Sequence, residues 1–255
     1  MNTEQIVTRS ERVDKHFPAH GNWQGLRIGQ ITSGWLSYIL SQGDHRLNHV
    51  ESWAGNLPVT LRVGLETDVR ALDFSDDRLA AVLNYFAQDE DWECFERNLN
   101  GRLLRVYNLK AERVRIDTTT AKSYTGVSEG GLFQFGHSKD HRPDLAQLKI
   151  SQSTLDPLGI PVTTTVVPGN CADDPLYIPE IKRVQASLGT RGLLLIGDSK
   201  MGSLETRAYV AHTEDHYLCP LSAVQIPQAK LEELLALIVA PATLTAHSES
   251  FAVSG

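Results

Sequence analysis

The segment RVRIDTTT, residues 113–120, alternates branched apolar and polar side chains and places an acid, Asp117, where the apolar run stops. A second segment, GLLLIGDSK at 192–200, is an uninterrupted apolar run followed by Gly197 and Asp198. Such a run bounded by glycines is typical of a central strand that is buried on both faces of a parallel sheet. Ligands of open α/β sheets bind outside the carboxyl ends of the strands. The two aspartates are therefore predicted to be two ligands of one divalent-metal site.

Downstream of residue 111, the sequence predicts a three-stranded meander followed by alternating helices and strands. The strands are expected at 113–117, 147–155, 160–167, 192–197 and 217–221, and the helices at 173–188, 203–212 and 230–239. The turn DPLG at 156–159 makes a hairpin of the second and third strands. This order is the layout of an α/β fold with a ribonuclease H-like mixed sheet, whose first and fourth strands are parallel neighbours. Asp117 and Asp198 would then lie side by side, within reach of one metal ion.

The region before this sheet is predicted to be a mainly helical N-terminal domain, residues 1–110, ahead of a partial ribonuclease H-like core at 111–255. Helices are expected at 26–40, 45–53, 79–86 and 89–104, whereas residues 1–20 lack clear periodicity. Ser75 is the expected N-cap of the helix at 79–86. No predicted helix carries a cluster of Arg and Lys on one face. The sequence therefore leaves open whether this domain binds DNA or caps the core.

The composition is that of a globular protein, with 41% hydrophobic and 22% charged residues among 255. The formal net charge of −7 does not by itself predict the basic face of a nucleic-acid enzyme. The three cysteines are far apart and show no paired spacing, which favours a reducing cytoplasm and argues against a zinc site of clustered cysteines. No apolar run approaches the roughly 20 residues that span a membrane. A cytoplasmic location without membrane contact is therefore expected.

Several motifs together resemble a known family, the DDE transposases of bacterial insertion sequences in the insertion-sequence-four superfamily. They are IDTTT at 116–120, GHSKDHRPDLAQLKI at 136–150, DPLGIPVTTTVVPGNCADDPLYIPEI at 156–181 and GDSKMGS at 197–203. VDKHFPAHGNWQGLRIGQI at 13–31 is also similar to the N-terminal region of one branch, so the resemblance covers most of the chain. It implies a ribonuclease H-like fold, Mg²⁺ or Mn²⁺, and cleavage and joining of double-stranded DNA at transposon inverted-repeat ends and in target DNA. The first two acids of the family triad fall on Asp117 and Asp198.

Carboxylates suit this chemistry because hard divalent cations prefer oxygen ligands. Two such cations about 3.5–4 Å apart can bind the attacking and leaving oxygens of a phosphoryl transfer. By this logic Asp117 would bridge both ions and Asp198 would hold one. Basic residues near the two acids are predicted to contact DNA phosphates: Lys139, His141, Arg142, Lys200 and Arg207. A solvated polar loop is the alternative for the first three of them.

The sequence departs from the family at the third acid. The family places a glutamate in a Tyr-x-x-Arg-x-x-x-Glu-x-x-x-x-x-x-Lys pattern on a later helix, and this pattern is missing here. Glu232 and Glu233 lie on the last predicted helix without the tyrosine and arginine partners. The chain is therefore expected to be a C-terminally truncated transposase with an unassigned third acid and little or no cleavage activity. An unpartnered apolar face on 230–239 would favour pairing with another chain, so a homodimer is among the expected partners.

Plainer interpretations remain open for the same residues. Asp117 could cap a turn, and Asp198 could be a helix N-cap. Ser199 follows Gly197-Asp198 in a pattern similar to the nucleophile motif of some esterases, which would also need a nearby histidine. A regulator that binds DNA or a partner without catalysis is the alternative to an active transposase.

Overall fold

The computed structural model describes the backbone at residues 3–137, 142–221 and 226–239, and the side chains of residues 10–236 within those ranges. The chain divides into two compact units. A helical unit comprises Met1–Ala111 together with Arg183–Thr190, and a sheet unit comprises Glu112–Lys182 together with Arg191–Gly255. The predicted contacts Lys139 and His141 lie outside the described residues.

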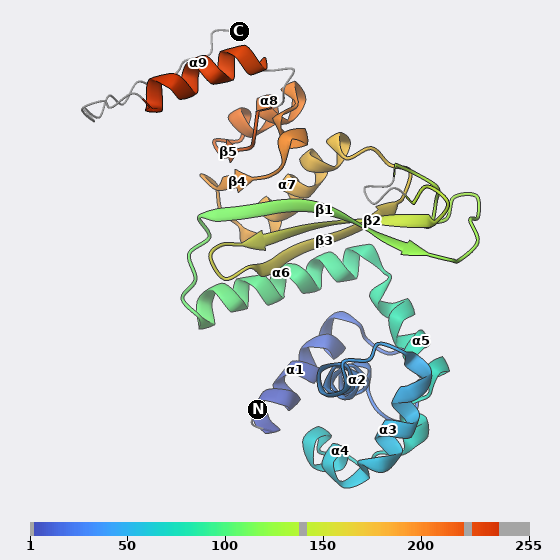
Figure 1. Ribbon diagram of the computed structural model, residues 1–255. Coiled ribbons are helices and arrows are strands. Elements are labelled where there is room, and N and C mark those ends of the chain that lie inside the picture. Colours follow the sequence, from blue (N-terminus) through green and yellow to red (C-terminus); the bar gives the residue numbers. More distant parts are fainter. Residues whose placement is uncertain (1–2, 138–141, 222–225, 240–255) are drawn as a thin grey trace. The chain divides into compact units, whose positions relative to one another are not determined.

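The helical unit consists of α-helices and two short 3₁₀ turns (Figure 1). The elements are α1 Thr3–His16, α2 Ile28–Gln42, η1 Leu47–His49, α3 Val50–Asn56, α4 Pro58–Leu65, η2 Ala71–Phe74, α5 Asp76–Phe86 and α6 Asp89–Val106. The four helices expected from periodicity are confirmed. Ser75 precedes α5 in an extended N-cap conformation, although its side chain makes no capping hydrogen bond. Helices α1 and α4 lie where the sequence predicts none.

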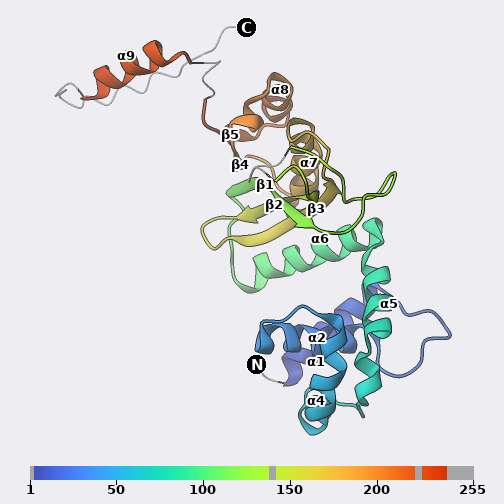
Figure 2. The same cartoon turned by 45° about the vertical axis from the view of Figure 1, so that its right-hand side comes forward.

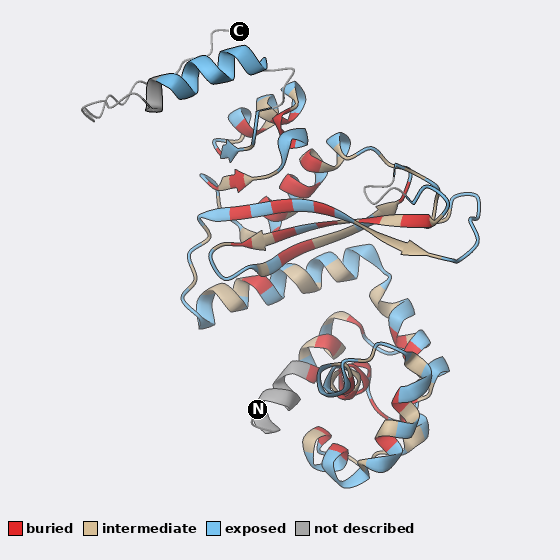
Figure 3. Cartoon of the chain, in the orientation of Figure 1, coloured by how far each residue is buried: buried red, intermediate tan, exposed pale blue. Residues whose placement is uncertain are grey.

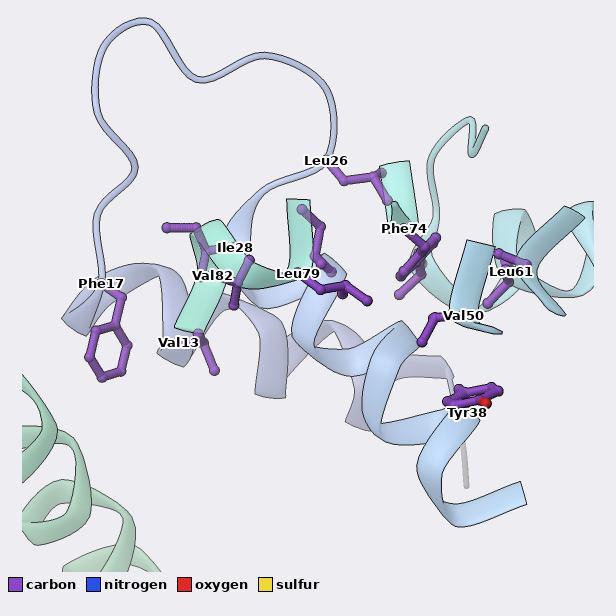
Figure 4. Close-up of a cluster of buried hydrophobic side chains, with 13 residues drawn as sticks. Val13, Phe17, Leu26, Ile28, Tyr38, Val50, Leu61, Phe74, Leu79 and Val82 are labelled. Carbon is purple, nitrogen blue, oxygen red and sulfur yellow. The ribbon is translucent and has the colours of Figure 1, made fainter. Parts of the chain in front are cut away.

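A hydrophobic cluster holds these helices together, and Figure 4 shows side chains from α1, α2, α3, α4 and α5 converging on it. Val13 in α1 and the following Phe17 are buried in the cluster, so tertiary packing stabilises a helix whose own periodicity is weak. Two glycines allow close packing on α2. A Cβ at Gly29 would lie 1.9 Å from the carbonyl oxygen of Ser10, and one at Gly34 would lie 2.4 Å from the Phe74 ring. The glycines that interrupt the apolar pattern of α2 are therefore packing positions.

The sheet unit contains a mixed sheet whose five described strands have the order β3-β2-β1-β4-β5. The strands are β1 Arg113–Ser123, β2 Ala146–Leu155, β3 Ile160–Pro168, β4 Leu194–Ile196 and β5 His216–Leu218. β1, β2 and β3 pair antiparallel, whereas β4 pairs parallel with both β1 and β5. This is the strand order of a ribonuclease H-like sheet, so the predicted fold class and the parallel β1–β4 pair are confirmed.

Three helices belong to the crossover part of the chain: α7 Tyr177–Leu188, α8 Leu204–His212 and α9 Gln228–Val239. Figures 1 and 2 show the first half of α7 beside the sheet. The second half of α7 belongs to the helical unit through contacts with α6: Arg183 bonds Glu96 at 2.8 Å, and Asn100 bonds Ser187 at 2.7 Å. Among the described side chains of α9, Leu231, Leu234 and Leu235 are exposed, as expected for an unpartnered face (Figure 3). None of the described helices is long and apolar enough to cross a membrane.

The two faces of the sheet differ along β1, where buried and exposed residues alternate (Figure 3). Val114 and Ile116 are buried, whereas Arg115 and Asp117 are exposed. The face that α7 covers has a polar interior. Glu180 of α7 is only 2% exposed, and it accepts hydrogen bonds from Ser153 of β2 and from Thr163 and Thr165 of β3. These bonds attach the first turns of α7 to the meander.

Candidate active site

The parallel pairing of β1 with β4 places the two predicted acids near the same end of two neighbouring strands. Arg115 pairs with Ile196 at the last described step of this ladder. Counting two residues further along each chain reaches Asp117 and Asp198. Both side chains are exposed. The same end of the two central strands therefore presents both carboxylates.

Asp117 does not end its strand, which corrects the expected boundary. β1 continues to Ser123, and Asp117 pairs with Gln152 inside the β1–β2 ladder. The threonines that follow are β-branched and fit a strand, which explains why the ladder with β2 extends past the acid. What ends near Asp117 is the pairing with the short strand β4. The Asp117 Oδ1 accepts a hydrogen bond from the Thr118 amide at 2.8 Å.

Asp198 caps the 3₁₀ turn η4 Ser199–Gly202, so the N-cap interpretation is confirmed. Its Oδ1 accepts one hydrogen bond from the Lys200 amide at 2.8 Å and another from the Tyr177 hydroxyl at 2.7 Å. Among the described residues, its Oδ2 has no hydrogen-bond partner. One carboxylate oxygen is thus fixed by two donors, and the other remains available to a ligand.

Tyr177, in the first turn of α7, is a site residue that the sequence did not reveal. Burial raises the pKa of Tyr177, and the hydrogen bond to Asp198 and the negative charges of Asp198 and Asp117 raise it further. Both carboxylates are therefore within electrostatic reach of one phenol. The Asp-Asp-Pro sequence at 173–175 predicts the helix start, but only the folded β4–η4 connection shows that the first turn meets Asp198.

The donor chemistry of the acid pair fits Mg²⁺ or Mn²⁺. Mg²⁺ is commonly held by one or two carboxylates, with waters and substrate phosphates completing its shell. Asp117 and the free Oδ2 of Asp198 supply such oxygens. Within the described ranges, however, no group of three or more His, Cys, Asp or Glu side chains could hold a metal ion. The pair therefore offers two carboxylates, and waters or substrate phosphates would complete the shell of a bound cation.

The described structure supplies no third acid at this site. On α9, Glu232 accepts a hydrogen bond from Gln228, and Glu233 pairs with Lys230 at 2.9 Å. Both glutamates therefore interact within their own helix. Glu180 is occupied by hydroxyl groups of the meander.

The three described basic candidates differ in their partners. Arg142 pairs with Asp144 at 2.8 Å, and Lys200 lies 3.7 Å from Asp174. Arg207 on α8 has a buried Nε without a hydrogen-bond partner, and the described part of the chain gives its guanidinium no carboxylate partner. Burial raises the pKa of the Cys219 thiol; the charge of Arg207 lowers this pKa, and the charge of Asp198 raises it. Of the three described candidates, Arg207 is the one without a described carboxylate partner.

The esterase interpretation of Ser199 finds no support in the described residues. Ser199 is an exposed residue of η4, and its hydroxyl has no described histidine as hydrogen-bond partner. A serine nucleophile requires such a base within hydrogen-bond reach.

A second concave region, a polar cleft of ≈ 680 Å³, lies within the helical unit and was not predicted from the sequence. It is lined by residues of α2, η1, α3 and their connections, including Asp44 and Trp53. Asp44 accepts hydrogen bonds from Arg46 at 3.0 Å and from Tyr38 at 2.6 Å. These bonds hold the pKa of Asp44 well below its usual range, and the bond from Arg46 has the larger effect. The carboxylate in this cleft is thus already occupied by donors of the protein.

The solved structures that are similar to this chain share little sequence with it. No protein-family model and no curated protein matches the chain. The chain is similar to the Mos1 strand transfer complex (12% identity, TM-score 0.30, covering 86% of this chain and 66% of that one). It is also similar to the piggyBac transposase synaptic complex with hairpin DNA (10%, 0.40, 97% and 52%). A third similar structure is the Mos1 mariner paired-end complex with Mn (13%, 0.30, 92% and 72%).

The chain thus spans 66% and 52% of the lengths of the first two of these structures. At identities of 10–13% and TM-scores of 0.30–0.40, this likeness supports no conclusion about the fold, which stands on the strand order of the sheet. The likeness assigns no function to Asp117 or Asp198.

Proposed function

We propose that the chain is a transposase polypeptide of the DDE type, from a bacterial insertion sequence of the insertion-sequence-four superfamily. The observation that carries this proposal is the position of Asp117 and Asp198, each two residues beyond the Arg115–Ile196 pair that ends the parallel β1–β4 ladder of a ribonuclease H-like sheet. The IDTTT and GDSK motifs that surround the two acids support the same assignment. The proposed domains of this transposase are a helical N-terminal domain at 1–110 and a partial ribonuclease H-like core at 111–255.

The proposed reaction is metal-dependent cleavage and transfer of DNA strands. Bound Mg²⁺ or Mn²⁺ would supply a Lewis acid that neutralises charge on the transferring phosphoryl group. Asp117 and the free Oδ2 of Asp198 would hold it. Arg207 and Lys200 would bind phosphate oxygens of the DNA and fix the strand against the two acids. Lys139, His141 and Arg142 are further proposed phosphate contacts.

The proposed partners are transposon inverted-repeat ends and target DNA, and a second copy of the chain. With a formal net charge of −7, binding depends on local basic residues rather than on the overall charge. The described cysteines Cys94, Cys171 and Cys219 are free thiols, which suits the proposed cytoplasmic location.

One observation favours a second function, DNA binding without catalysis. The described residues provide two acids and no third ligand beside them. Two carboxylates are expected to bind metal weakly, so strand cleavage should be slow or undetectable. Such a chain could still occupy transposon ends and inhibit an intact relative.

Three measurements on the purified full chain test these functions. They are Mn²⁺ binding by titration calorimetry, gel shifts on inverted-repeat and scrambled duplexes, and nicking of supercoiled plasmid with Mn²⁺. Asp117→Asn and Asp198→Asn should each abolish Mn²⁺ binding. Glu205→Gln is the matched control, because it removes one exposed carboxylate of α8 in the same unit.

The outcomes separate the functions. Preferential binding to inverted-repeat DNA without nicking supports the non-catalytic regulator. Nicking that disappears in Asp117→Asn supports the enzyme and shows that two acids, or two and an unassigned third, suffice. If both Asn variants bind Mn²⁺ as the unmodified chain does, and no duplex is preferred, the proposed function is wrong.

A further inference from the structure

Tyr177 makes a contact with the acid pair that packing alone does not require. Its ring is buried, with only 3% of the residue exposed, yet its hydroxyl reaches the exposed Asp198 and donates to Oδ1 at 2.7 Å. The hydroxyl of a buried tyrosine usually has a hydrogen-bond partner, and here that partner is one oxygen of a proposed metal ligand.

The ring is held in place from the other side by Gly197. A Cβ at Gly197 would lie 3.1 Å from Tyr177 Cε1 and 2.6 Å from the sulfur of the fully buried Met201. The absence of a side chain at Gly197 therefore leaves room for the ring directly beneath Asp198. This packing fixes where the phenol hydroxyl lies.

Two donors bond to the same oxygen, Oδ1, of the Asp198 carboxylate. Lys200 donates through its backbone amide at 2.8 Å, and Tyr177 donates through its side chain. With Oδ1 occupied twice, rotation of the carboxylate would break both bonds. Oδ2 is consequently the oxygen presented to a ligand.

We propose that Tyr177 is a positioning residue that orients Asp198 as a one-oxygen ligand of the divalent cation. This inference rests on the proposed function, because it takes Asp198 as a metal ligand. Hydrogen-bonded partners of metal ligands fix ligand orientation, and their loss typically costs about 10–100-fold in metal affinity. Tyr177 would act through Asp198 and would not touch the cation itself.

The test is the Mn²⁺ dissociation constant of the full chain without DNA, measured by electron paramagnetic resonance of free Mn²⁺. Tyr177→Phe removes the hydroxyl and keeps the ring that packs under Gly197. We expect Mn²⁺ to bind it at least about 10-fold more weakly. Tyr217→Phe is the matched control, because Tyr217 is a 40% exposed tyrosine of β5 in the same unit. Its Mn²⁺ affinity should equal that of the unmodified chain.

A second variant perturbs the same packing while keeping the hydroxyl. In Gly197→Ala the added Cβ would lie 2.6 Å from the Met201 sulfur and 3.1 Å from Tyr177 Cε1, so Met201 must shift and the Tyr177 ring is crowded, and Mn²⁺ binding should also weaken. The melting temperature without metal is recorded for every variant. A purely structural role would lower that temperature and leave the Mn²⁺ dissociation constant of the folded protein unchanged.

The possible results distinguish this inference from the function on which it rests. Weaker Mn²⁺ binding in Tyr177→Phe, with a normal Tyr217→Phe, supports the positioning role. Unchanged Mn²⁺ binding in Tyr177→Phe, together with its loss in Asp198→Asn, overturns the positioning role and leaves the proposed function intact. If Asp198→Asn also binds Mn²⁺ normally, the proposed function itself fails.

Discussion

Replacing Glu180 with alanine would leave buried hydroxyl groups of the sheet without their acceptor. Glu180 is 2% exposed, and its Oε1 accepts hydrogen bonds from Ser153 at 2.8 Å and from Thr163. Its Oε2 accepts one from Thr165 at 2.7 Å. Ser153 and Thr163 are 0% and 2% exposed, so neither hydroxyl can turn to bulk water.

The expected loss of stability follows from these two groups. A buried donor that loses its partner costs about 1–3 kcal/mol. Two such donors would cost about 2–6 kcal/mol, but Glu180→Ala also removes the cost of burying a charged group. The expected net loss of unfolding free energy is therefore about 2–4 kcal/mol. The half-buried Thr165 hydroxyl adds little because water can replace its acceptor. Thr163→Val removes one donor at similar volume and should cost less, about 1–2 kcal/mol.

Urea unfolding followed by circular dichroism measures these differences. With a slope of about 2 kcal/mol per molar, Glu180→Ala should lower the midpoint by about 1–2 M. Glu205→Gln, at an exposed site of α8, should change stability by less than about 0.5 kcal/mol. A Glu180→Ala midpoint as close to the unmodified chain as that of Glu205→Gln would refute the reasoning, since it would mean that the carboxylate is not the acceptor of the buried hydroxyls.

Further predictions concern both units. Gly29→Ala should destabilise the helical unit by about 3 kcal/mol or more, because the added Cβ would lie 1.9 Å from the Ser10 carbonyl oxygen. Gly101→Ala is the control: Gly101 is also helical, an added Cβ would have no atom within 4 Å, and the change should stabilise the unit by about 0.5–1 kcal/mol. Equal melting temperatures for the two variants would contradict this packing. Burial raises the pKa of Asp73, but hydrogen bonds from Arg70 outweigh burial and hold that pKa below its usual value. Asp73 therefore contributes stability above its unfolded pKa of 3.8, and this stability is lost as the pH falls through the lower folded value. Asp73→Asn should lower the melting temperature at pH 7, with the difference shrinking below about pH 4; a difference that persists at pH 2 would argue against the ion pair. Arg207→Ala should weaken binding to any DNA duplex and reduce the salt slope of the binding constant by about 1. Arg142→Ala should weaken DNA binding less, because Asp144 already pairs with Arg142. Equal losses of binding in gel shifts at several salt concentrations would be evidence against this ranking.

The hairpin of β2 and β3 was predictable because its signals are local. The hairpin at 147–155 and 160–167 follows from a turn sequence between two β-branched runs, and the structure has β2 and β3 at Ala146–Leu155 and Ile160–Pro168. The end of β1 was not predictable from the apolar run. Thr118 to Ser123 stay in the strand because they pair with β2, and this pairing is set by residues more than twenty positions away. Apolar periodicity reports burial, and it misses a strand segment that is held mainly by its ladder.

Two residues near the predicted acids have no signal of their own in the sequence. Asp117 and Asp198 stand out because each follows an apolar run. Tyr177 has no such signal, since an aromatic residue in a first helical turn is usually a packing residue. The sequence alone suggests that Glu180 is an acid on the helix surface, whereas the structure shows that it accepts hydrogen bonds from hydroxyl groups of β2 and β3. Both side chains make their hydrogen bonds to segments that are distant in the sequence, and no local pattern encodes these contacts.

Tyr177 and Glu180 together attach one side of α7 to the sheet. Tyr177 and Glu180 are three positions apart on α7, so they lie on the same side of the helix. Glu180 ties that side to β2 and β3, and Tyr177 ties it to the residue that follows β4. In the order β3-β2-β1-β4-β5, these anchors flank β1, the strand that carries Asp117. The first turns of α7 are therefore attached to β2, to β3 and to the residue after β4 through two side chains that lie one helical turn apart.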